Sequence, residues 1–114
     1  MSATTDLIDR EIAAYRARNL DEFLSFYSAD AVIRDGDGNI VVGGALEMRE
    51  YYGSLFRSSP DLRLEIPRRI EFGEYVIDEE IVDGINVEGF PSQLHAAVVY
   101  RVKDSKISQL TFLM

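Results

Sequence analysis

The spacing of apolar residues changes once along this chain, at Pro60, and that change limits the fold more than any other feature. Before Pro60, Met48, Tyr52 and Phe56 recur at the spacing of one helix face. After it, Leu62, Leu64 and Ile66 alternate with charged residues, as in a strand with one buried face. Helices followed by strands predict the α+β class, with the two kinds of element segregated along the chain.

Local signals give the expected order of elements. Helices are predicted over about 5–18, from Asp21 through the following apolar residues, and over 45–58. Short strands over 31–34 and 40–42 flank the sequence DGDGN, which predicts a hairpin turn. Beyond Pro60, an antiparallel series is predicted, with strands over 62–72, 75–83, 93–103 and 106–113. Pro67 indicates an edge strand or a bend.

Composition excludes several classes of function. The 114 residues predict one domain over 1–114, and 46% hydrophobic content is enough for a real core. A net charge of −8 argues against nucleic-acid binding and against docking on anionic membranes. The chain has no cysteine, no signal-peptide pattern and no apolar run of membrane-spanning length. We therefore expect a soluble, cytoplasmic protein.

The order and spacing of several segments resemble the nuclear transport factor 2-like superfamily, in its SnoaL-like and ketosteroid isomerase-like branch. The resemblance is carried by RARNLDEFLSFYSADAVIRDGDG, Gly44, MREYY and YRVKDSKISQL, and it extends over nearly the whole chain. It implies a cystatin-like, cone-shaped α+β roll whose helices pack on a strongly curved antiparallel sheet and enclose a pocket. It also implies a homodimer joined through the outer face of the sheet. It implies no single function, since this scaffold hosts isomerases, cyclases, dehydratases, adaptors and non-catalytic binders.

Asp35 is the first candidate catalytic residue. If Ala31 and Ile33 face inward, strand alternation sends Asp35 inward as well, where desolvation would raise its pKa toward that of a general base. By the resemblance, it matches the proton-shuttling aspartate of ketosteroid isomerases. The alternative is an Asx turn, in which the side chain accepts hydrogen bonds from the Gly36–Gly38 backbone. A calcium loop is rejected, because Leu46 stands where an EF-hand needs glutamate.

Glu79 and three tyrosines complete the candidate chemistry. Glu79 shares a strand face with Ile77 and Ile81, which favours a position in the pocket over the exposed alternative. Two carboxylates in one pocket would split their pKa values into an acid and a base. Tyr15, and by the same argument Tyr52 and Tyr100, would donate a hydrogen bond to a substrate oxygen, with ordinary core packing as the alternative.

The remaining expectations concern the pocket wall and the cofactors. The residues expected to contact a substrate are Ile33, Tyr52, Phe56, Val98, Tyr100 and Phe112. The single histidine, His95, is expected to face outward with a structural role. No metal and no cofactor is predicted, because cysteine is missing, one histidine cannot form a zinc pair and no dinucleotide fingerprint follows a strand.

The resemblance to ketosteroid isomerases is incomplete at two positions. Glu11 stands where those enzymes have the tyrosine that holds the steroid oxygen, and Val98 stands near the position of its partner acid. We therefore do not predict steroid isomerisation. Two classes of function stay open. One is a cofactor-free acid–base enzyme of the isomerase, cyclase or dehydratase type that acts on a small apolar molecule. The other is a non-catalytic protein that binds a ligand or serves as a dimeric scaffold or protein-interaction adaptor.

Overall fold

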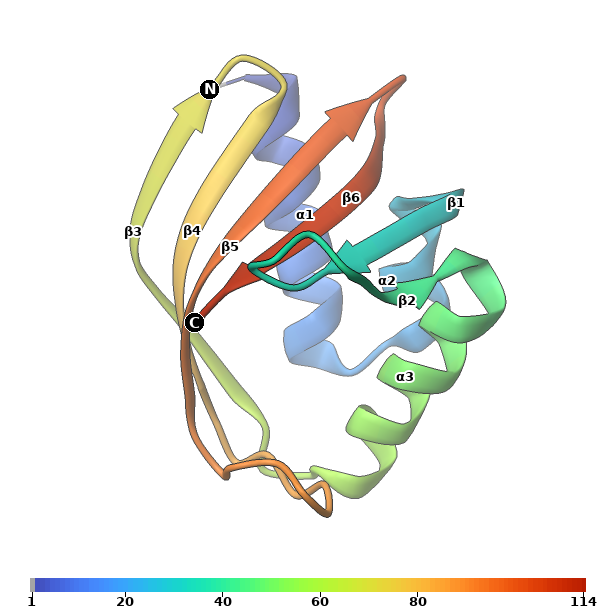
Figure 1. The fold of residues 1–114 in the computed structure, drawn as a ribbon, viewed down its shortest axis with the longest axis vertical. Coiled ribbons are helices and arrows are strands. Elements are labelled where there is room, and N and C mark those ends of the chain that lie inside the picture. The colour runs from blue at the N-terminus through green and yellow to red at the C-terminus, as the bar shows by residue number, and fades with distance from the viewer. Residues whose placement is uncertain (1) are drawn as a thin grey trace.

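The computed structural model describes residues 2–114 and confirms the α+β class, with three helices and one six-stranded sheet (Figure 1). The helices are α1 (Ala3–Ala17), α2 (Leu20–Ser25) and α3 (Gly44–Ser58). The strands are β1 (Tyr27–Arg34), β2 (Ile40–Gly43), β3 (Arg63–Phe72), β4 (Tyr75–Asp83), β5 (Leu94–Lys103) and β6 (Lys106–Leu113). Most bounds lie within two residues of the prediction. None of the helices within residues 2–114 is long and apolar enough to cross a membrane.

The strand order across the sheet is β2-β1-β6-β5-β4-β3. The four strands after Pro60 form the predicted antiparallel series, while β1 runs parallel to β6 and joins the N-terminal hairpin to it. β3 is an edge strand, and its register with β4 shifts between Glu65 and Arg68, around Pro67. The predicted edge position of Pro67 is therefore confirmed.

β1 begins at Tyr27, earlier than predicted. Its first residues include the polar Ser28 and the exposed Asp30, and its register with β6 shifts between Tyr27 and Val32. A strand segment without continuous pairing or a continuous apolar face leaves little signal in the sequence.

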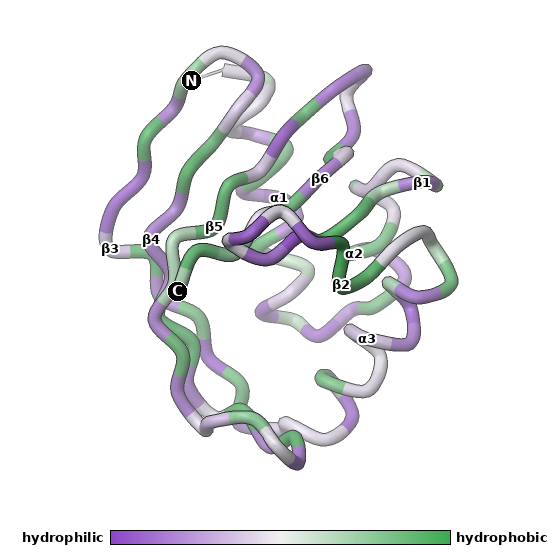
Figure 2. The backbone as a smooth tube through the Cα atoms, viewed as in Figure 1, coloured by the Kyte–Doolittle hydropathy of each residue, from purple (hydrophilic) through white to green (hydrophobic). Residues whose placement is uncertain are grey.

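The helices cover one face of the curved sheet, and the curvature leaves α3 separated from the lower parts of β4 and β5 (Figure 1). Hydrophilic and hydrophobic residues alternate along β3 and β4, as expected for strands with one covered face (Figure 2). The core under α1 and α2 includes Ile8, Phe23, Val76, Val98 and Ile107, all fully buried. All three helices contribute to this core, since buried residues of α3 also belong to it.

The start and the end of α1 have clear local causes. The Ser2 side chain accepts a hydrogen bond from the Thr5 N–H at 3.0 Å, which caps the first turn. Arg18 takes a left-handed conformation (φ 53°), and its N–H bonds to the carbonyls of Ala14 and Tyr15. The helix is thereby held at both ends, which fixes the position of Glu11 and Tyr15 over the sheet.

Candidate functional site

A cavity of about 670 Å³ lies between the helices and the concave face of the sheet. Its walls come from all three helices, from five of the strands and from the loop after β4. Aromatic and aliphatic side chains dominate the walls, and the polar groups are chiefly glutamates and tyrosines. A volume of this size, with few polar groups, is typical of sites for small organic molecules.

Glu11 enters the cavity from α1. It is only 3% exposed, and it accepts a hydrogen bond on Oε2 from the Tyr27 hydroxyl at the start of β1. Burial raises the pKa of Glu11 to about 8, the Tyr27 hydrogen bond opposes that rise, and the charges of Glu80 and Asp78 add to it. Glu11 is therefore mostly a neutral carboxylic acid at pH 7.

Glu80 enters the same cavity from β4, and it is 6% exposed. The Tyr100 hydroxyl, on β5, donates to Glu80 Oε2 at 2.7 Å. Burial raises the pKa of Glu80 to about 7, and the nearby charge of Asp78 adds to the rise. A carboxyl group with this pKa is divided between its two protonation states near neutral pH, which is what an efficient general base requires.

The two glutamates influence each other's titration, because the negative charge of Glu80 contributes to the raised pKa of Glu11. Near neutral pH the cavity therefore holds two carboxyl groups of raised pKa, one projecting from a strand and one from a helix. Two carboxyl groups with separated pKa values form a pair suited to acid–base chemistry.

An ion pair with a buried carboxylate supports the positions of the two glutamates. Asp78 is fully buried two residues before Glu80, and Arg69 of β3 binds both of its oxygens, at 2.6 and 2.9 Å. Arg69 also reaches Asp9 on α1 at 2.6 Å. Because Asp9 lies two residues before Glu11, this bridge ties the helix that carries one glutamate to the strand that carries the other. The charge of Arg69 also lowers the pKa of both glutamates.

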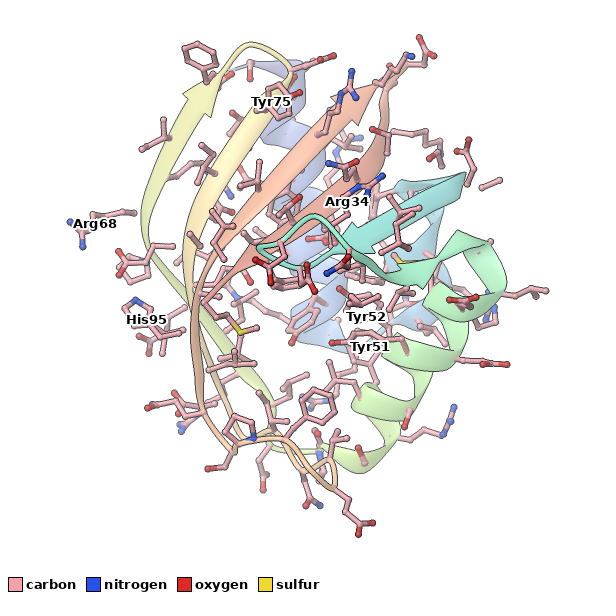
Figure 3. All side chains as sticks on the ribbon, viewed as in Figure 1. Arg34, Tyr51, Tyr52, Arg68, Tyr75 and His95 are labelled. Atoms are coloured by element: carbon pink, nitrogen blue, oxygen red, sulfur yellow. The ribbon has the colours of Figure 1, made fainter. Side chains whose placement is uncertain are left out.

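Aromatic rings form the inner wall beside the glutamates. Phe23 is fully buried, and its ring centroid lies 4.5 Å from that of Tyr52 and 5.9 Å from that of Tyr15. Burial raises the pKa of Tyr15 and Tyr52, so both phenols keep their protons and serve only as neutral donors. Tyr51 and Tyr52 extend from α3 toward the sheet (Figure 3).

The predicted inward orientation of Asp35 is wrong. Its Oδ1 accepts hydrogen bonds from the N–H groups of Asp37 and Asn39, each at 3.0 Å, and the residue does not contribute to the cavity wall. These hydrogen bonds lower the pKa of Asp35. The Asx-turn alternative describes the structure, because the carboxylate accepts hydrogen bonds from two backbone N–H groups of the turn. The interior carboxyl groups of the candidate site come from Glu11 and Glu80 instead.

The predicted inward orientation of Glu79 is also wrong. Arg68 binds its Oε1 at 2.7 Å, and the Nε2 atom of His95 lies 2.7 Å from its Oε2. Arg68 and His95 project from the side of the sheet that faces away from the helices (Figure 3). The hydrogen bond from Arg68, followed by the one with His95, lowers the pKa of Glu79. His95 lies on the outer face, as predicted.

The other predicted residues divide into cavity wall and core. Tyr15, Tyr52, Tyr100 and Phe112 line the cavity. The other three predicted wall residues, Ile33, Phe56 and Val98, are buried without lining it, and they pack behind the wall. The sequence therefore predicts the apolar and phenolic part of the candidate site but not its carboxyl groups.

Glu11 and Glu80 each left a weak signal in the sequence. Glu11 lies beside the apolar stripe of Ile8, Ile12 and Tyr15 on the predicted helix. Glu80 shares its strand face with Val76 and Val82. The ends of this face are as apolar as those of the opposite face, which carries Ile77 and Ile81. In the sheet, Asp78 pairs with Val98 and Glu80 with Ala96. Because paired residues share a face, the inward face of β5 also identifies the inward face of β4.

No group of His, Cys, Asp and Glu side chains within residues 2–114 has an arrangement that fits a metal ion. The glutamates and tyrosines that line the cavity are able to form hydrogen bonds and to transfer protons.

Comparison with known proteins places the chain in a family. The SnoaL-like domain model matches residues 8–110, which is most of the chain, and the protein belongs to this family. No match was found among curated protein sequences.

Solved structures agree with this assignment. A cystatin-fold protein from Novosphingobium aromaticivorans, itself uncharacterised, has a TM-score of 0.87 and 27% identity, with 100% of this chain and 99% of that chain covered. A proposed polyketide cyclase from Sinorhizobium meliloti has a TM-score of 0.77 at 17% identity, covering 98% and 99% of the two chains. The protein TerC, co-crystallised with polyporic acid, has a TM-score of 0.77 at 19% identity, covering 97% and 90%. The last two establish similarity of fold alone.

Proposed function

We propose that this protein is a cofactor-independent acid–base enzyme that moves a proton within a small apolar molecule bound in the cavity. Glu80 is the general base, and Glu11 is the acid or hydrogen-bond donor. The observation that carries this proposal is the pair of buried glutamates, one from β4 and one from α1, that line a single cavity. Each is held by one tyrosine hydroxyl.

The proposed reaction needs no group beyond these side chains. The Glu80 carboxylate removes a proton from a carbon next to a carbonyl group, and the electron pair moves onto the carbonyl oxygen. The protonated Glu11 carboxyl donates a hydrogen bond to that oxygen as its negative charge develops. Glu80 then returns the proton to another carbon of the same system, which completes an isomerisation. Neither an oxidant nor a reductant is required.

The pKa directions support these roles. At neutral pH a base must be partly deprotonated and a donor must keep its proton, and the pKa values of about 7 for Glu80 and about 8 for Glu11 meet both conditions. The family is compatible with the proposal, since its structural neighbours include a proposed polyketide cyclase and a protein crystallised with polyporic acid. The role of general base, which the sequence predicts for Asp35, is thereby assigned to Glu80.

Hydrogen–deuterium exchange tests the proposal directly. The purified protein is incubated in D₂O with 2-tetralone, 1-decalone and anthrone, and loss of the proton signal beside the carbonyl is followed by NMR against a buffer blank. We expect accelerated exchange for at least one ketone, and a fall of about 100-fold or more in Glu80→Gln. Glu79→Gln is the matched control, because it alters the adjacent residue on the outer face, and it should retain the rate.

Binding without turnover is the second candidate function. It is favoured by the hydrogen bonds that each glutamate already receives from a tyrosine, which would equally stabilise an inert polar wall. Ketone binding with no acceleration of exchange would overturn the catalytic proposal and support this one. The predicted homodimer, the cytoplasmic location and the single domain over 1–114 stay predictions.

A further inference from the structure

The cavity contains acidic side chains and no basic side chain. Four glutamates line it, Glu11 and Glu80 in the interior and Glu47 and Glu50 at the entrance. Within residues 2–114, no lysine, arginine or histidine belongs to its wall. A negatively charged ligand would find no counter-charge there, and would be repelled by the ionised glutamates.

Each interior glutamate has one carboxyl oxygen that is available to a ligand. Each is more than nine-tenths buried, and in each only Oε2 receives a hydrogen bond, from Tyr27 or Tyr100. Within residues 2–114, no hydrogen bond to Oε1 of either side chain is found, and the Ser28 hydroxyl is the only fully enclosed side-chain group without a partner, so both Oε1 atoms are accessible from the cavity. In its carboxylate form, Glu80 favours a ligand that brings donors or positive charge, whereas the protonated Glu11 can donate to an acceptor atom of the same ligand.

The nearby arginines do not cancel this charge. Arg69 is already paired with two carboxylates, those of Asp78 and Asp9. Arg16 lies close enough to lower the pKa of Glu80, but its guanidinium donates to the carbonyl of Leu64 and does not form part of the wall. The net charge of the chain, −8, adds to the negative potential.

The entrance is where a charged substituent of a ligand would meet water. Glu47, Glu50, Tyr51 and Ser54 recur at intervals of three and four residues, so they form one stripe of α3 along the cavity. Both glutamates are exposed, and Glu47 also accepts the Gly43 N–H at 2.9 Å. A carboxylate beside an accessible tyrosine ring suits an ammonium group, which both attract.

From this arrangement we infer that the ligand of the cavity is an apolar ring compound that carries a protonated amine. The rings lie against the aromatic wall near Glu80, and the ammonium group lies at the entrance between Glu50 and Tyr51. The inference rests on the proposed function, because it identifies the class of substrate for the same cavity. In this arrangement the ammonium group is recognised at the entrance, and the carbon that Glu80 deprotonates lies in the interior.

Three probes with the same ring system test the inference: 9-anthracenylmethylamine, 9-anthracenylmethanol and anthracene-9-carboxylate. Their intrinsic fluorescence reports binding to the purified protein at about pH 7, where the amine is a cation and the acid an anion. At low salt we expect the amine to bind about 10-fold more tightly than the alcohol, and the carboxylate to bind least. The preference for the amine should shrink at about 0.5 M salt, while the affinity for the alcohol should not fall.

Variants locate the charge that is responsible. Glu50→Gln should reduce the preference for the amine over the alcohol by about 3-fold, without loss of alcohol binding. Glu65→Gln, on the exposed part of β3, changes the net charge equally and should leave the preference intact. Equal affinity for amine and alcohol, tightest binding of the carboxylate, no binding of any probe, or equal loss in both variants would each overturn the inference.

These outcomes separate the inference from the proposed function. The exchange assay uses neutral ketones and depends on Glu80, whereas the probe series needs no turnover and depends on Glu50. Ketone exchange without a preference for the amine overturns the inference alone. A preference for the amine without exchange supports the inference and overturns the catalytic role.

Discussion

Glu79 and Glu80 are consecutive residues of β4, yet they lie on opposite faces of the sheet with opposite pKa shifts. Glu79 binds Arg68 and His95 outside, and these partners lower its pKa. Glu80 accepts a hydrogen bond from Tyr100 inside the cavity, where burial raises its pKa. Strand alternation alone makes one glutamate a surface ion-pair partner and the other a candidate base.

The first prediction concerns stability and pH. The pKa of Glu11 is raised from 4.5 to about 8, so between these values the folded protein keeps a proton that the unfolded chain has lost. The folded state is therefore progressively destabilised as pH rises through this window, by a few kcal/mol in total. We expect Glu11→Gln, which cannot ionise, to be more stable than the wild type at about pH 9, by on the order of 3 kcal/mol.

Urea unfolding at about pH 5 and about pH 9 measures this difference. The gain in the free energy of unfolding should be small at the lower pH, where Glu11 is protonated in the folded protein, and large at the higher one. The exposed Glu65→Gln variant serves as the control and should show no such change. A pH-independent effect of Glu11→Gln would contradict the buried, neutral Glu11.

The second prediction concerns the hydrogen bond between Tyr100 and Glu80. The Tyr100 hydroxyl stabilises the ionised form of Glu80, so its removal in Tyr100→Phe should raise the pKa of Glu80 further. NMR titration of ¹³C-labelled glutamate side chains would detect this rise in the pKa of Glu80. Tyr75→Phe, which removes a hydroxyl from a residue outside the cavity wall, should leave the titration unchanged.

The third prediction concerns Asp35. Asp35→Ala removes two hydrogen bonds to turn N–H groups, so it should lower the melting temperature slightly. Because the pKa of Asp35 is lowered in the fold, its stabilising effect is present at neutral pH and is lost as the pH falls through that lowered value. Since Asp35 does not line the cavity, the exchange rate with ketones should stay within about 2-fold of the wild type. A large loss of rate would restore Asp35 as the candidate base.

The sequence predicts the fold of this protein well because most of its elements carry complete local signals. The stripe of Met48, Tyr52 and Phe56 is buried as expected, and the turn residues that end each strand set the bounds. The carboxyl pair was missed for a physical reason. β4 and β5 are joined by the long connection over 84–93, and a long connection does not fix the register or the inward face of a strand.

The prediction that Glu79 faces inward follows from the same uncertainty. Ile77 and Ile81 make one face of β4 look like the core face, yet both are only half-buried on the outside. Asp78 and Glu80 occupy the inside because Arg69 and Tyr100 come from other strands to bind them. Such tertiary partners, separated by many residues, leave no local pattern in the sequence.

The last prediction concerns Gly84, where β4 ends and the loop that borders the cavity begins. Its φ of +76° is strained for any other residue, and a Cβ atom there would lie 2.2 Å from the carbonyl oxygen of Asp61. Gly89, in the same loop, has a similar φ of +85° but open space around it. Gly89→Ala should therefore destabilise the protein by about 1 kcal/mol through backbone strain alone, and Gly84→Ala by clearly more.

Because the clash is with backbone, the loop must move away from Leu62 and Asp61, which should also weaken binding of the anthracene alcohol in Gly84→Ala but not in Gly89→Ala. Thermal unfolding and fluorescence titration of the two variants measure both effects, and equal destabilisation would contradict the close approach at Gly84.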